Sequence, residues 1–194
     1  MELVFATNNP NKTKEIQELL PATIKILSLE KFNIKEDIPE NQNTLEGNAH
    51  EKASYIYNKL GKNCFADDTG LEIDSLDGEP GVYSARYAGS SKDPRANMEK
   101  VLKKLENVAN RQARFRCVIA LIIDGQEKLF EGAINGTIIH EQRGSEGFGY
   151  DPVFLPNGYG QTFAEMPLEL KNQISHRSQA INKLADYLTA HYHE

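Results

Sequence analysis

Residues 64–81 read CFADDTGLEIDSLDGEPG, a short apolar run that leads two adjacent carboxylates, Asp67 and Asp68, into Thr69 and Gly70. Thr-Gly after such a run predicts a turn at a strand tip, with a second short strand over residues 71–76. A carboxylate pair at a turn can hold a hard divalent cation and leave one oxygen free to take a proton from water. The alternative is a solvated turn without function, because Asp, Thr and Gly are ordinary turn residues.

The first residues predict a site for an anion. Residues 3–7 are typical of a buried strand, and Asn9 and Pro10 are a favoured N-cap and first residue for the helix that follows. A strand, a polar turn and a helix N-terminus together present free backbone N–H groups to an anion, and Lys12 stands beside them. A capped helix start without a ligand remains the alternative interpretation.

A stripe of polar residues marks the helix predicted between Thr44 and Leu60. Thr44 is a typical N-cap, and Gly61 is a typical helix end. Thr44, Asn48 and Lys52 recur every four residues and therefore stack along one edge of the helix. An edge between the buried face and solvent favours a position in a cleft, although a lysine that covers the margin of the core would show the same spacing.

The remaining strands predict a mixed sheet. A second strand is expected over residues 23–29, and an irregular polar segment over 31–43. Asp124-Gly125 joins two apolar runs, 113–123 and 127–139, and such a pair is a strong signal for a β-hairpin. Strands linked by helices early in the chain and an antiparallel hairpin late in the chain predict an α/β fold.

The last third of the chain contains a glycine-rich loop, GSEGFGYDP, over residues 144–152. Its glycines let the backbone approach a ligand closely, and Phe148 between two of them can stack on a flat ring. Further on, Lys171 precedes a helix that Ser175 caps, and His176 and Arg177 are the first residues at its positive end. A nucleotide contact here competes with the ordinary interpretation, a capping serine followed by solvated side chains.

The composition is that of a compact, enzyme-sized protein. The chain has 194 residues, of which 39% are hydrophobic and 26% charged, which suits one domain, or one domain with two lobes. The net charge of −6 argues against binding to nucleic acid or to an anionic membrane, because both require a basic surface. It does not exclude an anionic small molecule, which local lysines and a bound cation can hold.

The apolar runs and the cysteines predict a cytoplasmic protein. The longest apolar run, residues 117–123, is too short to span a membrane, and the N-terminus lacks the pattern of a signal peptide. Cys64 and Cys117 lie far apart inside apolar runs. We therefore expect buried, reduced thiols, with no disulfide and no zinc site.

Six blocks of the sequence together resemble one known family, the inosine triphosphate pyrophosphatases, also called HAM1-like pyrophosphatases. The blocks follow the family's order from one end of the chain to the other, so their combination is far more specific than any single block. They are TNNPNK at 7–12, TLEGNA at 44–49 with Lys52, FADDTG at 65–70, PGVYSARY at 80–87, FGYDP at 148–152 and SHR at 175–177.

The resemblance implies both a fold and an activity. The implied fold is a single domain over residues 1–194, an α/β structure with an elongated mixed β-sheet flanked by helices and two lobes with a nucleotide cleft between them. The implied activity is hydrolysis of non-canonical purine nucleoside triphosphates (dITP, ITP and XTP) to the monophosphate and pyrophosphate, with Mg²⁺, which cleanses the nucleotide pool. The family also implies a homodimer.

The resemblance further implies roles for individual residues. Asp68 resembles the general base that activates water, and Lys52 the lysine that acts beside it. The implied Mg²⁺ ligands are Glu40, Asp67 and Asp68. The residues implied to hold the triphosphate are Thr7, Asn8, Asn9, Pro10, Asn11, Lys12, Lys52, Thr69 and Lys171, and those implied to hold the base and sugar are Phe148, Gly149, Tyr150, Asp151, His176 and Arg177.

Elementary chemistry agrees with these roles and limits one of them. A triphosphate is strongly anionic, so a cation and lysines must neutralise it before a hydroxide-like nucleophile can approach phosphorus. Adjacent residues of a strand point to opposite faces, so Asp67 and Asp68 can share a metal only if the backbone turns between them. We therefore rank Asp68 first as the base and expect Asp67 to be a cation ligand or an orienting residue.

Two positions depart from the family pattern without arguing against it. Asn8 stands where the family usually has Gly, and Asn tolerates unusual φ angles better than most residues. Thr69 stands where Ser is common, and it keeps the hydroxyl group. His176 and Arg177 are the candidate donors to the 6-oxo group of the base, because a site built to bind an oxygen leaves its donors unpaired when an amine arrives.

Two other functions are weighed against this hypothesis. The related Maf-type pyrophosphatases act on modified or pyrimidine nucleotides, but they open with a Ser-Pro-Arg-Arg type of motif that residues 7–12 do not match. A nucleotide-binding module without catalysis would be expected to have lost Asp68, Lys52 or Glu40, and all three are present.

Overall fold

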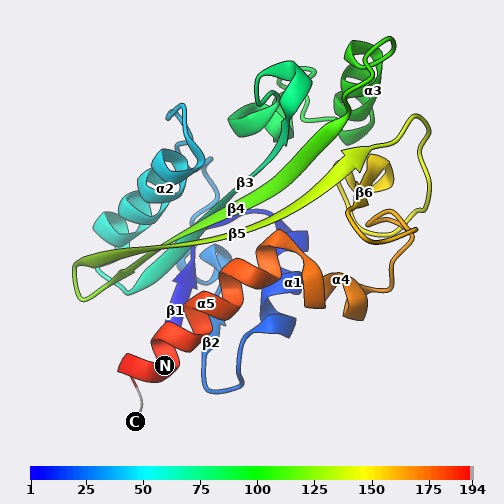
Figure 1. Ribbon diagram of the computed structural model, residues 1–194. Helices are drawn as coiled ribbons and strands as arrows, with labels where there is room; N and C mark the ends of the chain where they lie inside the picture. Colours follow the sequence, from blue (N-terminus) through cyan, green and yellow to red (C-terminus); the bar gives the residue numbers. More distant parts are fainter. Residues whose placement is uncertain (193–194) are drawn as a thin grey trace. The chain divides into compact units, whose positions relative to one another are not determined.

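The computed structural model describes residues 1–192, which form a mixed sheet with helices on its faces (Figure 1). The strands are β1 (Glu2–Phe5), β2 (Lys25–Leu27), β3 (Cys64–Ile73), β4 (Gln112–Ile123), β5 (Gln126–Ile138) and β6 (Phe154–Pro156). The α-helices are α1 (Pro10–Leu19), α2 (Leu45–Leu60), α3 (Pro94–Lys104), α4 (Leu168–Ile174) and α5 (His176–His191). Short 3₁₀ helices cover Leu29–Phe32, Asp74–Leu76, Gly81–Arg86 and Asp151–Val153.

The sheet combines parallel and antiparallel pairs, as the sequence predicts. The strand order is β2-β1-β3-β4-β5-β6. β1 pairs in parallel with β2 and β3, whereas β5 and β6 are antiparallel. β4 and β5 form the predicted hairpin, in which Asp124 and Gly125 have φ angles of 51° and 79°. Two positive φ angles in a two-residue loop are typical of the turn whose twist matches that of the strands.

The chain forms two compact units, each with its own core. The first unit comprises Met1–Asp68, Cys117–Gly132 and Arg177–Glu194, and the second comprises Thr69–Arg116 and Ala133–His176. β3, β4 and β5 contribute residues to both units. The first core contains residues of α1, α5 and the strands, and the second is rich in aromatic side chains.

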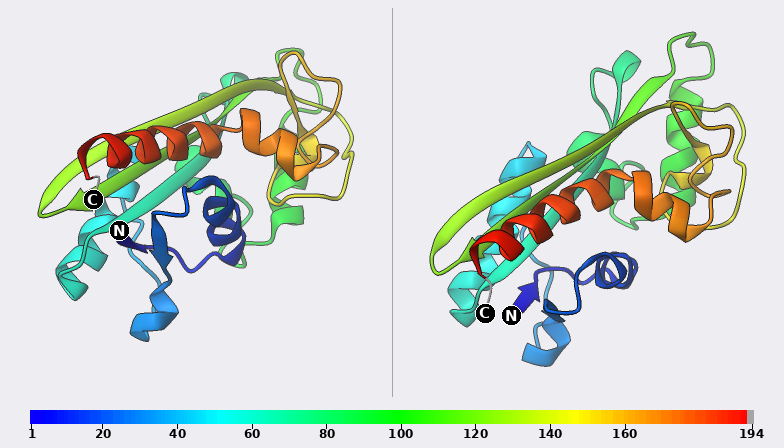
Figure 2. Two further views of the ribbon diagram at one scale, coloured as in Figure 1. Left: turned by 90° about the horizontal axis from the view of Figure 1, so that it is seen from below. Right: turned by 60° about the horizontal axis from the view of Figure 1, so that its bottom comes forward.

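In the first unit, α2 covers one face of the strands, and α1 and α5 cover the other (Figure 1). Phe5 and Phe65 stack with their rings 4.6 Å apart, in the same cluster as apolar residues of α1 and α5. On the opposite face, the Cys64 thiol donates to the backbone oxygen of Ala53 in α2 at 3.3 Å. Figure 2 shows α5 running alongside the β4–β5 hairpin. Successive residues of β3 therefore face different helices.

Both predicted ends of α2 are confirmed. The Thr44 hydroxyl accepts a hydrogen bond from the backbone N–H of Gly47 at 3.0 Å, and Gly61 ends α2 with a φ angle of 59°. Asp93 caps α3 in the same way, and Pro94 is its first residue. These caps satisfy backbone groups that a helix end would otherwise leave without partners.

The structure corrects the turn predicted after Asp68. β3 continues without interruption from Cys64 to Ile73, so Thr69 and Gly70 are strand residues and no separate second strand follows. The sequence pattern favours a turn where polar residues need solvent. Here Asp67 and Asp68 are both buried and have charged partners within the protein, so the strand has no reason to end at them.

Two smaller differences lie between β1 and α2. The second strand is shorter than predicted, because only Lys25–Leu27 pairs with β1. The first two residues of the segment predicted to be irregular, 31 and 32, belong to the 3₁₀ helix Leu29–Phe32. This helix ends at Asn33, whose φ angle is 55°. Asn is one of the few residues that adopt this left-handed conformation readily.

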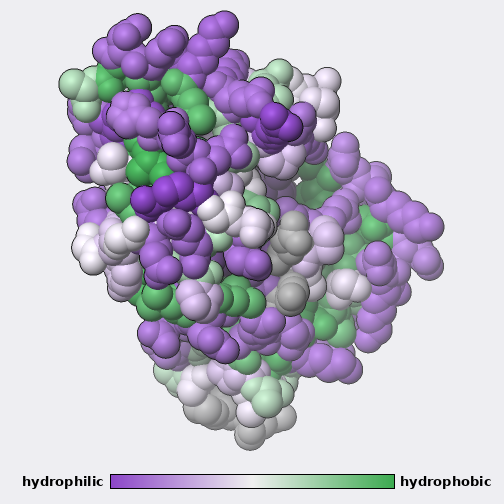
Figure 3. Space-filling view, turned by 90° about the vertical axis from the view of Figure 1, so that its right-hand side faces the viewer, coloured by the Kyte–Doolittle hydropathy of each residue, from purple (hydrophilic) through white to green (hydrophobic). Residues whose placement is uncertain are grey.

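One face of the protein is mostly polar. The face in Figure 3 is largely hydrophilic, with hydrophobic residues in small separate areas. Within residues 1–192, no helix is long and apolar enough to cross a membrane. Cys64 and Cys117 are buried thiols in β3 and β4.

Candidate active site

Asp68 lies on the face of β3 that α2 covers, where two α2 side chains hold its carboxylate. Lys52 Nζ donates to Asp68 Oδ1 at 2.9 Å, and Asn48 Nδ2 donates to Asp68 Oδ2 at 3.1 Å. Asn48 and Lys52 are four residues apart and therefore stack on one face of α2, as the sequence predicts. The same ammonium group of Lys52 also donates to Glu40 Oε1 at 2.9 Å. Three predicted site residues, Asp68, Lys52 and Glu40, thus lie together.

The segment that carries Glu40 is attached to α2 at further points. Glu51 accepts hydrogen bonds from the backbone and side-chain nitrogens of Asn41 at 2.7 and 3.3 Å. Asn48 Oδ1 accepts a hydrogen bond from the backbone N–H of Gln42 at 2.9 Å. These contacts hold the segment in place around Glu40 although it has no regular secondary structure.

Burial and charge act in opposite directions on this cluster. Burial raises the pKa of Asp68 above its ordinary value, and the lysines Lys52 and Lys12 offset this only in part. Burial alone would lower the pKa of Lys52, but the carboxylates of Asp68, Asp67 and Glu40 together raise it. Both directions hold because several carboxylates act on Lys52, whereas Asp68 shares that one ammonium group with Glu40. Asp68 is therefore a stronger proton acceptor than an exposed aspartate.

Asp67 lies on the opposite face of β3, among residues of α1 and α5. Lys12 Nζ lies 2.9 Å from Asp67 Oδ2, and Arg177 Nε lies 3.9 Å from the same oxygen. Arg177 also forms a buried ion pair with Glu15 of α1. Burial alone would raise the pKa of Asp67, but Lys12, Arg177 and Lys52 lower it to about 2.

Arg177 is stabilised by acidic neighbours in spite of an unfavourable position. It is the second residue of α5, where the helix dipole disfavours a cation. Burial alone would also lower its pKa, but Glu15 and Asp67 raise it above the ordinary value. The charge of this arginine is therefore maintained by the two carboxylates.

The start of α1 has the capped local structure that the sequence predicts. α1 begins at Pro10, and the backbone N–H of Lys12 donates to Asn9 Oδ1 at 3.4 Å, as expected of a capping asparagine. The backbone N–H of Asn9 donates to the Thr7 hydroxyl at 3.1 Å, and Asn8 Nδ2 donates to the backbone oxygen of Glu36 at 3.1 Å. The side chain of Asn11 lies outside the described part of the structure.

The second unit brings together the predicted residues of the glycine-rich loop and Lys171. Lys171 Nζ donates to Asp151 Oδ2 at 2.9 Å, and both side chains are buried. The backbone N–H of Phe148 donates to the same oxygen at 2.9 Å, and the Lys171 ammonium lies 5.3 Å from the centre of the Phe148 ring. A Cβ atom at Gly147 would lie 2.0 Å from Asp151 Oδ2, and the φ angle of 74° there also favours glycine.

His176 and Tyr150 are buried in the second unit. The His176 ring stacks on Phe115 with the ring centres 4.8 Å apart and the planes at 14°. The Tyr150 hydroxyl donates to the backbone oxygen of Ser84 at 2.7 Å, and burial raises the pKa of this phenol. Gly149 has a φ angle of 65°, which explains the third glycine of the loop. Thr69, the remaining predicted residue, is a partly buried residue of β3.

Sequence reasoning missed two buried residues of the first unit as members of the site. Glu15, the partner of Arg177, lies three residues after Lys12 on α1, a spacing that places both on one side of the helix. Asn48 belongs to the polar stripe recognised on α2, but its contact with Asp68 depends on how α2 packs against β3. The helical spacing was the available signal in both cases.

Within residues 1–192, the carboxylates alone do not make up a full set of ligands for a metal ion. No group of three or more His, Cys, Asp or Glu side chains that could hold a metal ion occurs in the described part of the chain. Glu40 and Asp68 both contact the ammonium of Lys52 at 2.9 Å, so their oxygens already converge on one cation. Mg²⁺ is commonly bound by one or two carboxylates together with substrate phosphates and waters, and this pair fits that mode.

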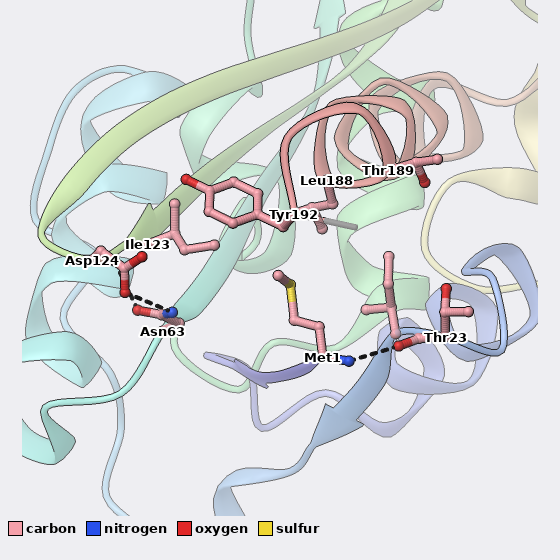
Figure 4. Close-up of a pocket in the computed structure, with 9 residues that line it drawn as sticks. Met1, Thr23, Asn63, Ile123, Asp124, Leu188, Thr189 and Tyr192 are labelled. Carbon is pink, nitrogen blue, oxygen red and sulfur yellow. Dashed lines mark hydrogen bonds between the residues drawn. The ribbon is translucent and has the colours of Figure 1, made fainter. Parts of the chain in front are cut away.

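A separate cavity of about 560 Å³ lies elsewhere in the first unit (Figure 4). In its wall, Asn63 Nδ2 donates to Asp124 Oδ1 at 3.2 Å, and the Met1 ammonium donates to the backbone oxygen of Thr23 at 2.8 Å. Its lining residues are Met1, Thr23, Ile24, Asn63, Ile123, Asp124, Leu188, Thr189 and Tyr192. None of the predicted site residues belongs to this lining, so this cavity is separate from the candidate active site.

Comparisons with known proteins agree with the sequence blocks. The model of the Ham1 family matches residues 3–187. A dITP/XTP pyrophosphatase of Flavobacterium johnsoniae is 56% identical over 190 residues, which cover 98% of this chain and 99% of that protein. The dITP/XTP pyrophosphatase of Bacillus subtilis is 47% identical over 193 residues, with coverage of 97% and 98%.

Solved structures of Ham1 proteins also align with this chain over nearly its whole length. The Staphylococcus aureus Ham1 protein aligns with a TM-score of 0.90 at 40% identity, over 98% of this chain and 99% of that one. A HAM1 protein from Coxiella burnetii aligns with a TM-score of 0.91 at 39% identity, with the same coverage of 98% and 99%.

Proposed function

The chain belongs to the Ham1 family, and on that premise we propose that it is a pyrophosphatase of non-canonical purine nucleoside triphosphates. It hydrolyses dITP, ITP and XTP to the nucleoside monophosphate and pyrophosphate. The relatives named dITP/XTP pyrophosphatases support the reaction. The observation in this chain that carries the proposal is the buried Asp68 carboxylate, held by Lys52 and Asn48 beside a second carboxylate, Glu40.

Asp68 acts as the general base. It accepts a proton from the attacking water, whose oxygen forms a bond to the α-phosphorus while the bond from that phosphorus to the bridging oxygen breaks. Pyrophosphate leaves and takes the electron pair of that bond. Burial supports this role, because it raises the pKa of Asp68 and so makes the carboxylate a better proton acceptor.

Glu40 and Asp68 are the ligands that we assign to a divalent cation, with Mg²⁺ the expected ion. When bound, such a cation neutralises charge on the triphosphate and polarises the phosphorus–oxygen bonds. The position of Asp67 on the opposite face of β3 supports its other predicted role, that of an orienting residue, through its contact with Lys12.

Lysines and backbone N–H groups from both units hold the triphosphate in this proposal. Lys12 and the backbone N–H groups at the start of α1 bind phosphate oxygens. The cap formed by Asn9 and the fixed φ angle of Pro10 hold these N–H groups in place before the substrate binds. We assign further contacts with the triphosphate to Thr7, Asn8, Asn11 and Thr69. Lys171 contributes a further ammonium group, whose present partner is Asp151.

The base and sugar are recognised by the glycine-rich loop and by the first two residues of α5. Phe148 offers a ring next to Lys171, and His176 is held rigidly by stacking on Phe115. Arg177 and His176 donate to the 6-oxo group, so a 6-amino group would leave these donors without partners and be rejected. The family resemblance also supports a homodimer, which light scattering coupled to gel filtration tests.

The test is pyrophosphate release from ITP, dITP, XTP, GTP, ATP, dCTP and dUTP, with and without Mg²⁺, by the wild type and the Asp68→Asn variant. The proposal expects Mg²⁺-dependent release from ITP, dITP and XTP, and its loss in the variant. A preference for pyrimidine nucleotides would indicate a Maf-type specificity instead. ITP binding without any release would indicate a nucleotide-binding module.

A further inference from the structure

The side chain of Asn48 connects two parts of the candidate site that are far apart in the sequence. It is fully buried on α2, with an exposed fraction of 0%. Its Oδ1 atom accepts the backbone N–H of Gln42 at 2.9 Å, and its Nδ2 atom donates to Asp68 Oδ2 at 3.1 Å. One amide group therefore joins the segment that carries Glu40 to the carboxylate on β3.

The two partners of Asn48 determine the orientation of its amide. A backbone N–H can only donate, and a carboxylate without a proton can only accept. A rotation of the amide by half a turn would place oxygen against oxygen at Asp68 and nitrogen against nitrogen at Gln42. Only one orientation satisfies both partners, and a buried polar group without a partner is costly.

Together with Lys52, Asn48 holds both oxygens of the Asp68 carboxylate. Lys52 occupies Oδ1 and Asn48 occupies Oδ2, and the two residues lie one turn apart on α2. The same two residues also hold the neighbouring segment, Lys52 at Glu40 and Asn48 at Gln42. α2 thus sets the direction of the Asp68 carboxylate and the place of Glu40 through one pair of side chains.

We propose that Asn48 is a positioning residue for the hydrolysis, which orients the Asp68 carboxylate only when the Glu40 segment is in place. This inference rests on the function proposed above. Asn48 acts through Asp68, so its loss lowers the rate of the chemical step and leaves nucleotide binding nearly unchanged. Catalysis is sensitive to small errors in such geometry, and misplacement of a catalytic group by about 1 Å can reduce the rate by about 100-fold.

The first test compares kcat and KM for ITP among three variants. Asn48→Leu removes both hydrogen bonds without adding charge, and Asn48→Asp keeps the acceptor for Gln42 but turns an acceptor toward Asp68. Asn58→Asp adds the same charge on an exposed position of α2 and is the matched control. We expect kcat to fall about 100-fold in both Asn48 variants, with KM within about threefold of the wild type.

The second test needs neither nucleotide nor metal. In ¹⁵N-labelled protein, Asp68→Ala should shift the side-chain amide signal of Asn48 and leave that of Asn58 unchanged. In Asn48→Leu, the backbone amide of Gln42 should exchange with deuterated solvent at least about tenfold faster, because its acceptor is gone. If the side-chain amide signal of Asn48 is the same in the wild type and in Asp68→Ala, the proposal is overturned, even if the Asn48 variants fail to fold.

The outcomes separate this inference from the proposed function. A wild type that releases no pyrophosphate from any nucleotide refutes the function and with it the catalytic role of Asn48. An active wild type whose Asn48→Leu variant matches Asn58→Asp in kcat refutes the role of Asn48 alone. A rise in KM without a fall in kcat also refutes it, because it would place Asn48 in substrate binding.

Discussion

Adjacent positions of β3 place an aspartate on each face of the strand, yet the pKa values of the two carboxyl groups are shifted in opposite directions. Asp67 lies among Lys12 and Arg177, which lower its pKa to about 2. Asp68 lies against α2, and burial raises its pKa. Asp67 therefore stays ionised down to a lower pH than an ordinary aspartate and holds cations in place, whereas Asp68 takes up a proton more readily.

The difference follows from the number of cations on each face. Asp67 has an ammonium and a guanidinium group close to the same oxygen, Oδ2. Asp68 is in direct contact with the ammonium group of Lys52, which also contacts Glu40, whereas Lys12 acts on Asp68 through its charge. A buried carboxylate keeps its charge only as far as its partners compensate for lost hydration. We therefore expect Asp68 to serve the chemistry and Asp67 to serve stability, although the two are neighbours in the sequence.

The largest effect is expected for Asp68→Asn. The variant keeps the size of the side chain but cannot accept the proton of water, so kcat should fall about 1,000-fold with little change in KM. Pyrophosphate release from ITP measures both quantities. Asp74→Asn, at an exposed position just after β3, is the matched control and should keep full activity. An active Asp68→Asn variant would contradict the division between the two faces.

Asp67→Asn should instead act mainly on stability. It leaves Lys12 and Arg177 without one of their anions, and breaking a buried ion pair costs about 3 kcal/mol of unfolding free energy. Urea unfolding at pH 7, followed by circular dichroism, measures this loss. If the variant is as stable as the wild type but lacks catalysis, Asp67 belongs to the reacting groups after all.

The third expected effect is that acid removes the contribution of Asp67 to the free energy of unfolding. The pKa of Asp67 is lowered from 3.8 to about 2, so its contribution is fully present above pH 3.8 and is lost as the pH falls through about 2. A difference of this size corresponds to about 2 kcal/mol. The gap in unfolding free energy between the wild type and Asp67→Asn should therefore narrow between pH 4 and pH 2, roughly the interval between the two pKa values. A gap that stays constant would show that Asp67 is not responsible.

The smallest effect is expected for Glu15→Gln. The amide oxygen can still accept a hydrogen bond from Arg177, which also keeps its second anion, Asp67. Because Asp67→Asn deprives Lys12 as well, the loss of unfolding free energy should be smaller here, about 1 kcal/mol. Glu18→Gln, at an exposed position of the same helix, is the control. A loss larger than that of Asp67→Asn would make Glu15, not Asp67, the main anion of this face.

Much of the fold could be predicted because its signals are local. The cap at Thr44, the glycine after α2 and the Asp124-Gly125 turn are each determined by a few neighbouring residues. The turn predicted after Asp68 was wrong, although its signal is equally local. The strand continues through Asp68 because of contacts with residues that are distant in the sequence. Buried cations on both faces replace the solvent that a turn would have supplied.

The candidate site divides along the same line. The sequence by itself determined the presence of Asp68, Lys52, Glu40 and the glycine-rich loop, and the order of their motifs identified the family. Only the tertiary structure decided that Asp67 and Asp68 have different partners, that Glu15 balances Arg177 and that Asn48 joins Gln42 to Asp68. The physical reason is that a residue's type and spacing are local properties. Its burial and its charged partners depend on which helix packs against which face of a strand.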